Sequence, residues 1–109
     1  MSGELIVFVT CPADLSQQLA RTVVEEHLAA CVNIIPGITS VYFWQDKLCQ
    51  ESEDLLIIKS NESSWHQLAS RIKELHTYDT PEIVSVSIRD GFEPYLQWLN
   101  QACLPKKTS

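Results

Sequence analysis

The sequence predicts an α+β fold in which two β-α-β units share one sheet. Three observations lead to this prediction. A short apolar run is followed by an amphipathic helix, a long apolar-aromatic hairpin stands in the middle, and a second helix precedes a strand of clean alternation. With 109 residues the chain is long enough for one domain and too short for two, so residues 1–109 are predicted to be a single domain.

The first unit begins with residues 5–9, an unbroken run of Leu, Ile, Val and Phe that is typical of a strand buried on both faces. Pro12 ends it. Asp14 is expected to cap a helix, with Gln17 completing a capping box, and the helix is expected to run to about His27. Its apolar positions repeat at helical spacing: Leu15, Leu19, Ala20, Val23, Val24 and Leu28.

The middle of the chain predicts a hairpin. A strand is expected over residues 31–35, and Pro36-Gly37 is expected to form a turn, since Pro presets φ and Gly accepts a positive φ. A second strand is expected over 39–44, then a polar tip at 45–47 and a returning strand over 55–59.

The second unit repeats the scheme. Asn61 is expected to cap a helix whose apolar stripe is Trp65, Leu68, Ala69, Ile72 and Leu75. A loop over 76–81 follows, because the residue before a proline leaves the helical region. Residues 82–89 alternate as a strand. A short helix with Pro94 in its first turn closes the fold, and residues 105–109 are expected to fray.

Two β-α-β units with right-handed crossovers give a ferredoxin-like split sandwich, here with a long β-hairpin and a C-terminal helix. Two helices cover only one face of the sheet. Val41, Tyr42, Phe43 and Trp44 then expose apolar surface and a bare edge, so we expect a closed homo-oligomer with Tyr42, Phe43 and Trp44 at the subunit interface. The alternative is that these side chains lie singly on the surface, which is common.

Composition narrows the function classes. The net charge of −6 argues against non-specific nucleic-acid binding. No apolar run approaches a membrane span, and the N-terminus lacks the basic stretch of a signal peptide, so a cytoplasmic protein is expected. Its four cysteines form no C-x-x-C pair and are expected to be free thiols.

Beyond these patterns, several stretches of the chain resemble one known family. The stretch "LAACVNIIPGITSVYFWQDKL" closely resembles the segment that marks the CutA family of divalent-cation tolerance proteins. The resemblance continues through "ESEDLLIIKS", "HTYDTPEIV" and "YLQWL", in register over essentially the whole chain. It implies a ferredoxin-like fold, a homotrimer similar in shape to the PII signalling proteins, a cytoplasmic location and a link to copper and other divalent metals. The chain departs from the family at Thr77, where Pro is usual, and at Asp46, where Gly is frequent.

The resemblance also points to a metal site. In copper-binding members the assigned ligands are a Cys late in the first strand and a His pair before the Tyr. The matching positions here are Val9, Leu75 and His76, so only His76 carries over. Cys11, two residues beyond Val9, is a candidate substitute because it shares that strand face and precedes a helix N-terminus, which favours a thiolate. Cys11 as an inert thiol in a turn is the alternative.

Other candidates surround His76. His76 itself is either a ligand or a cap at the helix C-terminus. Tyr78 and Glu82 are near enough in sequence to share a cleft with it, and Glu53 and Lys59 are further cleft or ligand candidates carried by the resemblance. Glu53 shares a strand face with Glu51, and such a pair either holds a hard cation or blocks unwanted strand pairing.

No catalytic motif of the hydrolase, metalloprotease or P-loop type is present in the sequence. The expected function is therefore non-enzymatic: a cytoplasmic homotrimer that binds Cu(II) or another divalent cation weakly and takes part in metal tolerance. The alternative is a PII-like regulatory trimer that holds a small ligand between subunits and signals to a partner protein. A purely structural trimer is the third possibility.

Overall fold

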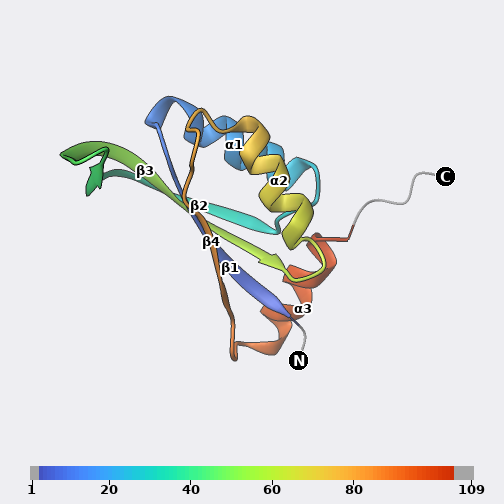
Figure 1. The fold of residues 1–109 in the computed structure, drawn as a ribbon. Helices are drawn as coiled ribbons and strands as arrows, with labels where there is room; N and C mark the ends of the chain where they lie inside the picture. Colours follow the sequence, from blue (N-terminus) through green and yellow to red (C-terminus); the bar gives the residue numbers. More distant parts are fainter. Residues whose placement is uncertain (1–2, 105–109) are drawn as a thin grey trace.

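The computed structural model describes residues 3–104, and its elements follow the predicted order β-α-β-β-α-β-α (Figure 1). They are β1 (Glu4–Cys11), α1 (Ala13–Glu25), β2 (Cys31–Trp44), β3 (Lys47–Asn61), α2 (Trp65–Leu75), β4 (Ile83–Ser87) and α3 (Glu93–Ala102). The predicted fraying of residues 105–109 lies outside the described residues. None of the described helices is long and apolar enough to cross a membrane.

The four strands form one sheet in the order β2-β3-β1-β4, with every neighbouring pair antiparallel. α1 and α2 cover one face of this sheet, and the β2–β3 hairpin extends beyond both helices (Figure 1). The predicted ferredoxin-like split sandwich with a long hairpin and a C-terminal helix is therefore confirmed.

The core lies between this sheet face and the two helices. Alternation along β1 turns Leu5, Val7, Val9 and Cys11 toward the helices, and each is buried. The helices and β3 supply the rest of the core: Leu19, Val23, Leu56, Ile58, Leu68 and Ile72.

The predicted turn at Pro36-Gly37 is wrong, because both residues lie within β2. The strand runs without a break from Cys31 to Trp44, and its register to β3 shifts between Ile35 and Ile38. Gly37 has the expected positive φ, 70°, but it serves a β-bulge rather than a turn. The buried carboxylate of Asp54 holds the bulge by accepting a hydrogen bond from Gly37 N at 3.2 Å.

The helix caps also differ from the prediction. Pro12, not Asp14, is the N-cap of α1, and Asp14 lies in the first turn without a capping hydrogen bond. Asn61 does not cap α2 but ends β3, where its side chain accepts a hydrogen bond from Ser64, the actual N-cap. The Asn61 side chain thereby satisfies the buried backbone N–H of Ser64 at the start of α2.

α1 ends two residues before the predicted His27. His27 N bonds to Val24 O and Leu28 N to Val23 O, which is the Schellman arrangement. His27 occupies the position where Gly is usual, with φ at 59°. The hairpin tip is a two-residue turn in which Gln45 and Asp46 both have positive φ, so β3 begins already at Lys47 rather than near Leu55.

α3 lies at the sheet end opposite the hairpin tip, where β1 begins and β3 ends (Figure 1). Asn100 of α3 donates to Glu4 at 2.6 Å and accepts from Asn61 at 2.9 Å. Leu99 and Cys103 pack with Ala30 in a small second cluster. These contacts fix the C-terminal helix to the ends of two central strands.

The second sheet face has no helix over it. The side chains that alternate with the core positions point to this open face, among them Ile35, Val84 and Val86, which are 42%, 48% and 47% exposed. Cys31 also lies on this face opposite Lys59 and is half-buried.

Candidate functional site

An acidic and aromatic cleft of about 420 Å³ lies on the open sheet face, along the hairpin from Glu53 to Trp44 next to its tip. β1 supplies Thr10, while β2 and β3 supply the side chains that share this face. The segment between α2 and β4 closes the other side. The full lining is Thr10, Tyr42, Trp44, Glu51, Glu53, Tyr78, Asp79, Thr80 and Glu82. Below, "the cleft" means this set.

Two tyrosine–glutamate pairs organise the cleft. Tyr78 donates its hydroxyl hydrogen to Glu53 Oε1 at 2.9 Å, and Tyr42 donates to Glu51 Oε1. The hydrogen bond to Glu51, followed by burial, raises the pKa of Tyr42 to about 12. Burial and the hydrogen bond to Glu53 raise the pKa of Tyr78 as well. Both phenols therefore remain protonated donors at neutral pH.

His76 is buried and both of its ring nitrogens are engaged. Nε2 donates to Thr10 O at 2.8 Å, and Nδ1 accepts from Tyr78 N at 3.1 Å, which requires the neutral Nε2–H tautomer. The ring also lies 4.6 Å from the Tyr78 ring, centroid to centroid. His76 thus ties the end of β1 to the loop that carries Tyr78 and positions that side chain in the cleft.

Cys11 lies on the helix-facing side of β1 and is fully buried. Burial, and then the negative charges of Asp54, Glu53 and Asp14, raises its pKa from 9.0 to about 11. This is the opposite direction to the thiolate expected at a helix N-terminus, because burial and three carboxylates outweigh the helix dipole.

Lys73 braces the loop that closes the cleft. Its ammonium group donates to the carbonyls of Tyr78 at 3.4 Å and Asp79 at 3.0 Å. The loop is thereby held to α2 by a charged donor. Its carboxylates face the cleft, and the residues that line the cleft include no lysine or arginine.

The structure brings together Glu53, Tyr78 and Glu82 of the predicted site residues, and His76 beside them. Lys59 lies apart, because it is six positions further along β3 than Glu53, a distance of about 20 Å. Within residues 3–104 no group of three or more His, Cys, Asp or Glu side chains is arranged to hold a metal ion. His76 and Cys11 do not form a ready metal site in this conformation, since one gives both nitrogens to hydrogen bonds and the other keeps its proton.

The sequence interpretation missed Thr10, Asp79 and Thr80 in the cleft. Thr10 could have been found, because alternation along β1 places it on the face opposite Cys11. Asp79 and Thr80 lie in a loop, and no periodic pattern in the sequence predicts the path of a loop.

The predicted interface residues remain uncovered in the chain. Tyr42, Phe43 and Trp44 are 38%, 75% and 53% exposed, and Leu48 across from Phe43 is 68% exposed. Tyr42 and Trp44 face the cleft, whereas Val41 and Phe43 lie on the other side of the hairpin.

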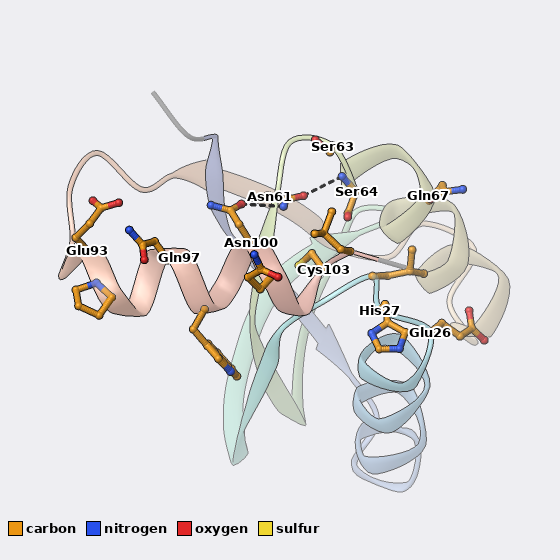
Figure 2. A pocket seen from close by; sticks show the side chains of 15 residues that line it. Glu26, His27, Asn61, Ser63, Ser64, Gln67, Glu93, Gln97, Asn100 and Cys103 are labelled. Atoms are coloured by element: carbon orange, nitrogen blue, oxygen red, sulfur yellow. Dashed lines mark hydrogen bonds between the residues drawn. The ribbon is translucent and has the colours of Figure 1, made fainter. Parts of the chain in front are cut away.

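A second cavity of about 890 Å³ lies between α3, the start of α2 and the end of α1 (Figure 2). Three of its polar residues bond to one another: Asn61 donates to Asn100 and accepts from Ser64 N, as the dashed lines in Figure 2 show. His27 lines it too, with Nδ1 within 3.3 Å of Ala102 O. Trp98 borders it half-exposed, and its ring lies 5.6 Å from the Tyr95 ring at a tilt of 38°. These bonds hold helix ends together.

Comparison with known proteins identifies the family. The family described as CutA1 divalent ion tolerance protein matches residues 5–102. "Divalent-cation tolerance protein CutA" of Thermus thermophilus is 42% identical over 99 residues, which cover 90% of this chain and 96% of that protein. "Protein CutA, chloroplastic" of Arabidopsis thaliana is 43% identical over 99 residues, 90% of this chain and 54% of that longer protein.

Solved structures agree with this match. "PII-like protein CutA from Nostoc sp. PCC 7120 in apo form" superposes with a TM-score of 0.88 at 31% identity, covering 94% of this chain and 99% of that one. The family match, the relatives and the shared fold all extend over nearly the whole chain. The protein therefore belongs to the CutA1 divalent ion tolerance family.

Proposed function

We propose that this protein is a cytoplasmic, non-enzymatic homotrimer that binds Cu(II) or another divalent cation weakly and takes part in metal tolerance. The observation that carries the proposal is the match of residues 5–102 to a family described by divalent ion tolerance. The net charge of −6 and a cleft with four carboxylates favour cations as ligands. The four free cysteines suit a reducing compartment.

The exposed apolar surface supports the homotrimer. β2 and β4 are the edge strands of the sheet, and the open face and the hairpin expose Ile35, Val86 and Phe43. Burying a side chain of this size stabilises an assembly by roughly 1.5–3 kcal/mol. A closed ring of identical subunits covers every copy of such a surface, whereas a monomer leaves it in water.

The environment of the two candidate ligands accounts for weak binding. A metal at Cys11 must displace a proton from a thiol whose pKa is raised to about 11. A metal at His76 must break the bond from Tyr78 N or the bond to Thr10 O. Thiolate and imidazole ligands suit copper or zinc once these costs are met.

The second candidate function is a PII-like regulatory trimer that holds a small ligand in its cleft and signals to a partner. The observation that favours it is the cleft itself, with a volume in the range of small-molecule sites and with convergent polar groups. The similar Nostoc protein is described as PII-like.

Calorimetric titration of the purified protein with Cu(II) and Zn(II) tests the leading proposal, beside His76→Ala and Cys11→Ser. Light scattering on the same samples gives the number of subunits. Saturable binding that either variant loses supports the metal site. Binding that neither variant changes overturns His76 and Cys11 as ligands, and no binding at all overturns the metal function while leaving the trimer to be judged by scattering alone.

A further inference from the structure

The segment that joins β4 to α3 contains the single Asp-Gly pair of the sequence, Asp90-Gly91. In Figure 1 this segment turns the chain from the end of β4 into α3. A glycine after an aspartate matters chemically, because without a Cβ it leaves its own peptide nitrogen uncrowded. The other four aspartates are each followed by a residue with a side chain: Leu15, Lys47, Leu55 and Thr80. Asp90 is thus the aspartate whose carboxyl carbon the following nitrogen reaches with least hindrance.

The structure brings these two groups into contact. Gly91 N donates to Asp90 Oδ1 at 2.9 Å, so the side-chain carboxyl is folded back toward the peptide bond that follows it. A small rotation about the side-chain bonds of Asp90 then brings Cγ to the Gly91 nitrogen. The buried Asp54 is different, because its two oxygens accept from Ser16 and from Gly37, which are distant in the sequence.

The backbone around the pair allows that rotation. Within residues 3–104, the last backbone–backbone hydrogen bond before the pair runs from Ile88 N to Glu4 O, and the next are those that Phe92 O accepts at the start of α3. Residues 89–91 make none, and the pair itself is exposed. A segment held by few hydrogen bonds rearranges at a low cost in free energy.

We propose that Asp90 is a site of spontaneous covalent modification, at which aspartate isomerises to isoaspartate through a succinimide ring. In the first step the Gly91 nitrogen bonds to Cγ of the protonated Asp90 carboxyl. The nitrogen gives up its proton and the carboxyl its hydroxyl, which leave together as one water. In the second step water adds to the ring carbonyl that came from the Asp90 backbone, and the bond from that carbon to the Gly91 nitrogen breaks. The nitrogen regains a proton, and the former backbone carbon becomes a free carboxylate.

This isomerisation needs no oxidant, metal or cofactor, and its product has the mass of the starting chain. Because both reacting groups belong to neighbouring residues of one chain, it uses neither the hairpin nor the open sheet face on which the proposed trimer depends. The inference is likewise independent of metal binding at Cys11 or His76 and of a ligand in the cleft.

The product lengthens the backbone by one methylene directly before α3. Phe92 is the N-cap of that helix, and the buried Leu96 packs so closely beside Gly91 that a Cβ added there would lie 3.1 Å from Leu96 Cδ2. Further along, Asn100 ties α3 to Glu4 in β1. The lengthened connection is therefore expected to loosen the first turn of α3 and to lower the midpoint of thermal unfolding.

Incubation of the purified full chain, followed by digestion and mass spectrometry, tests the proposal. A mildly acidic buffer is used, because carboxyl groups must be partly protonated to react. A protease that cuts after glutamate, but not before proline, gives the peptide 83–109 with Asp90 and the peptide 75–82 with Asp79. We expect the first to split with time into two chromatographic peaks of equal mass, beside a third that is lighter by one water. The second contains an exposed Asp-Thr pair and is expected to remain one peak.

Asp90→Glu is the decisive variant, since it keeps the charge but closes the corresponding larger ring far more slowly. It is expected to lose the second peak of equal mass. Asp90→Asn keeps an acceptor for Gly91 N and releases ammonia in place of water, so it is expected to convert faster at neutral pH and to gain a negative charge on isoelectric focusing. Asp79→Glu is the matched control and is expected to leave the peaks of the peptide 83–109 unchanged. Circular dichroism verifies that each variant folds.

Two peaks of equal mass that are lost in Asp90→Glu support the proposal. A single peak after incubation overturns it, and so does isomerisation of Asp79 to the same extent, which indicates general ageing of exposed aspartates. Isomerisation that occurs only in urea, where the chain is unfolded, also overturns it, because the folded contact would then not promote the reaction. An unchanged melting midpoint of the isomerised protein overturns the expected effect on α3.

Discussion

The hydroxyl of Ser16 in α1 donates to Asp54 Oδ2 in β3 at 2.7 Å, while Oδ1 of the same carboxylate accepts from Gly37 N in β2. Asp54 is 5% exposed, so one buried carboxylate joins the first helix, the central hairpin strand and the bulge of its neighbour. The arrangement holds the bulge at the point where the register of β2 to β3 shifts, between Ile35 and Ile38.

Replacing Asp54 by Ala is expected to lower the free energy of unfolding by about 2–3 kcal/mol, because two donors lose a charged acceptor in a buried position. Asp54→Asn keeps one acceptor oxygen and is expected to cost less. Urea unfolding at one protein concentration measures both. Ser16→Ala removes only one of the two bonds, and a loss for Ser16→Ala as large as for Asp54→Ala contradicts the bridging role.

The pH dependence of stability is expected to carry a contribution from Cys11. Its pKa is raised from 9.0 to about 11 in the folded chain, so the folded state holds the proton more tightly than the unfolded chain does. That contribution is fully present below pH 9 and is lost as the pH rises through 11. Thermal unfolding between pH 8 and 11 is the measurement.

Cys11→Ala is expected to flatten this alkaline loss, although it lowers stability at neutral pH by opening a small cavity. Val9→Ala, at another fully buried position of β1, controls for lost core volume and is expected to keep the original slope. An unchanged slope in Cys11→Ala would mean that the other groups with raised pKa values account for the alkaline loss, namely Tyr42, Tyr78, Tyr95 and Cys103.

The end of α1 allows a backbone effect to be separated from a side-chain contact. His27 has a φ of 59°, which suits Gly, and its ring contacts Ala102 O. Both His27→Gly and His27→Ala lose the ring, but Gly relieves the left-handed conformation. His27→Gly is therefore expected to be more stable than His27→Ala by about 1 kcal/mol in urea. Equal stabilities would mean that the turn relaxes when the ring is removed.

The hairpin tip is expected to tolerate and even favour an Asn-Gly turn. Gln45 and Asp46 both have positive φ, the condition of the two-residue turn that prefers Asn-Gly. The double change Gln45→Asn with Asp46→Gly is expected to raise stability by about 0.5–1 kcal/mol. Asp46→Val, which places a β-branched residue at positive φ, is expected to lower it. Thermal melts of the three proteins at equal concentration decide the order.

Subunit assembly is expected to depend on the hairpin. Phe43 is 75% exposed in the chain, and a lysine in its place would have to be buried without a partner in the proposed trimer. Phe43→Lys is expected to shift light scattering toward smaller species. Val24→Lys, on the exposed side of α1, is the matched control and is expected to leave the mass unchanged. A Phe43→Lys protein of unaltered mass places the contact elsewhere on the open face.

Local patterns predicted the elements well where periodicity was strong. The helical spacing of Leu68 and Ile72 and the apolar run of β1 both identified core positions that the structure confirms. The predicted boundaries of helices and strands were wrong where contacts with distant parts of the chain decide them. Pro36-Gly37 looks like a turn in isolation, but Asp54 and the β3 backbone keep the chain in the sheet as a bulge.

The site was predictable only in part, for the same reason. Tyr78 and Glu82 could be grouped because they are close in sequence, and Glu53 could be added from the family resemblance. The expected grouping with Lys59 failed because residues on one strand face can lie far apart along it. The tautomer of the His76 ring was not predictable, since its two hydrogen bonds are made with backbone groups of β1 and of its own loop.

The sequence by itself determined the order of helices and strands, the face of each that is apolar, and membership of the family, because these depend on residue types at short and regular spacings. Only the tertiary structure decided which side chains meet: that Cys11 lies buried beside carboxylates and keeps its proton, and that Glu53 lies in an aromatic cleft and accepts the Tyr78 hydroxyl. Burial and charge partners are set by strands that pair across distant parts of the chain, and these long-range contacts, rather than residue type, fix the chemistry of an ionisable group.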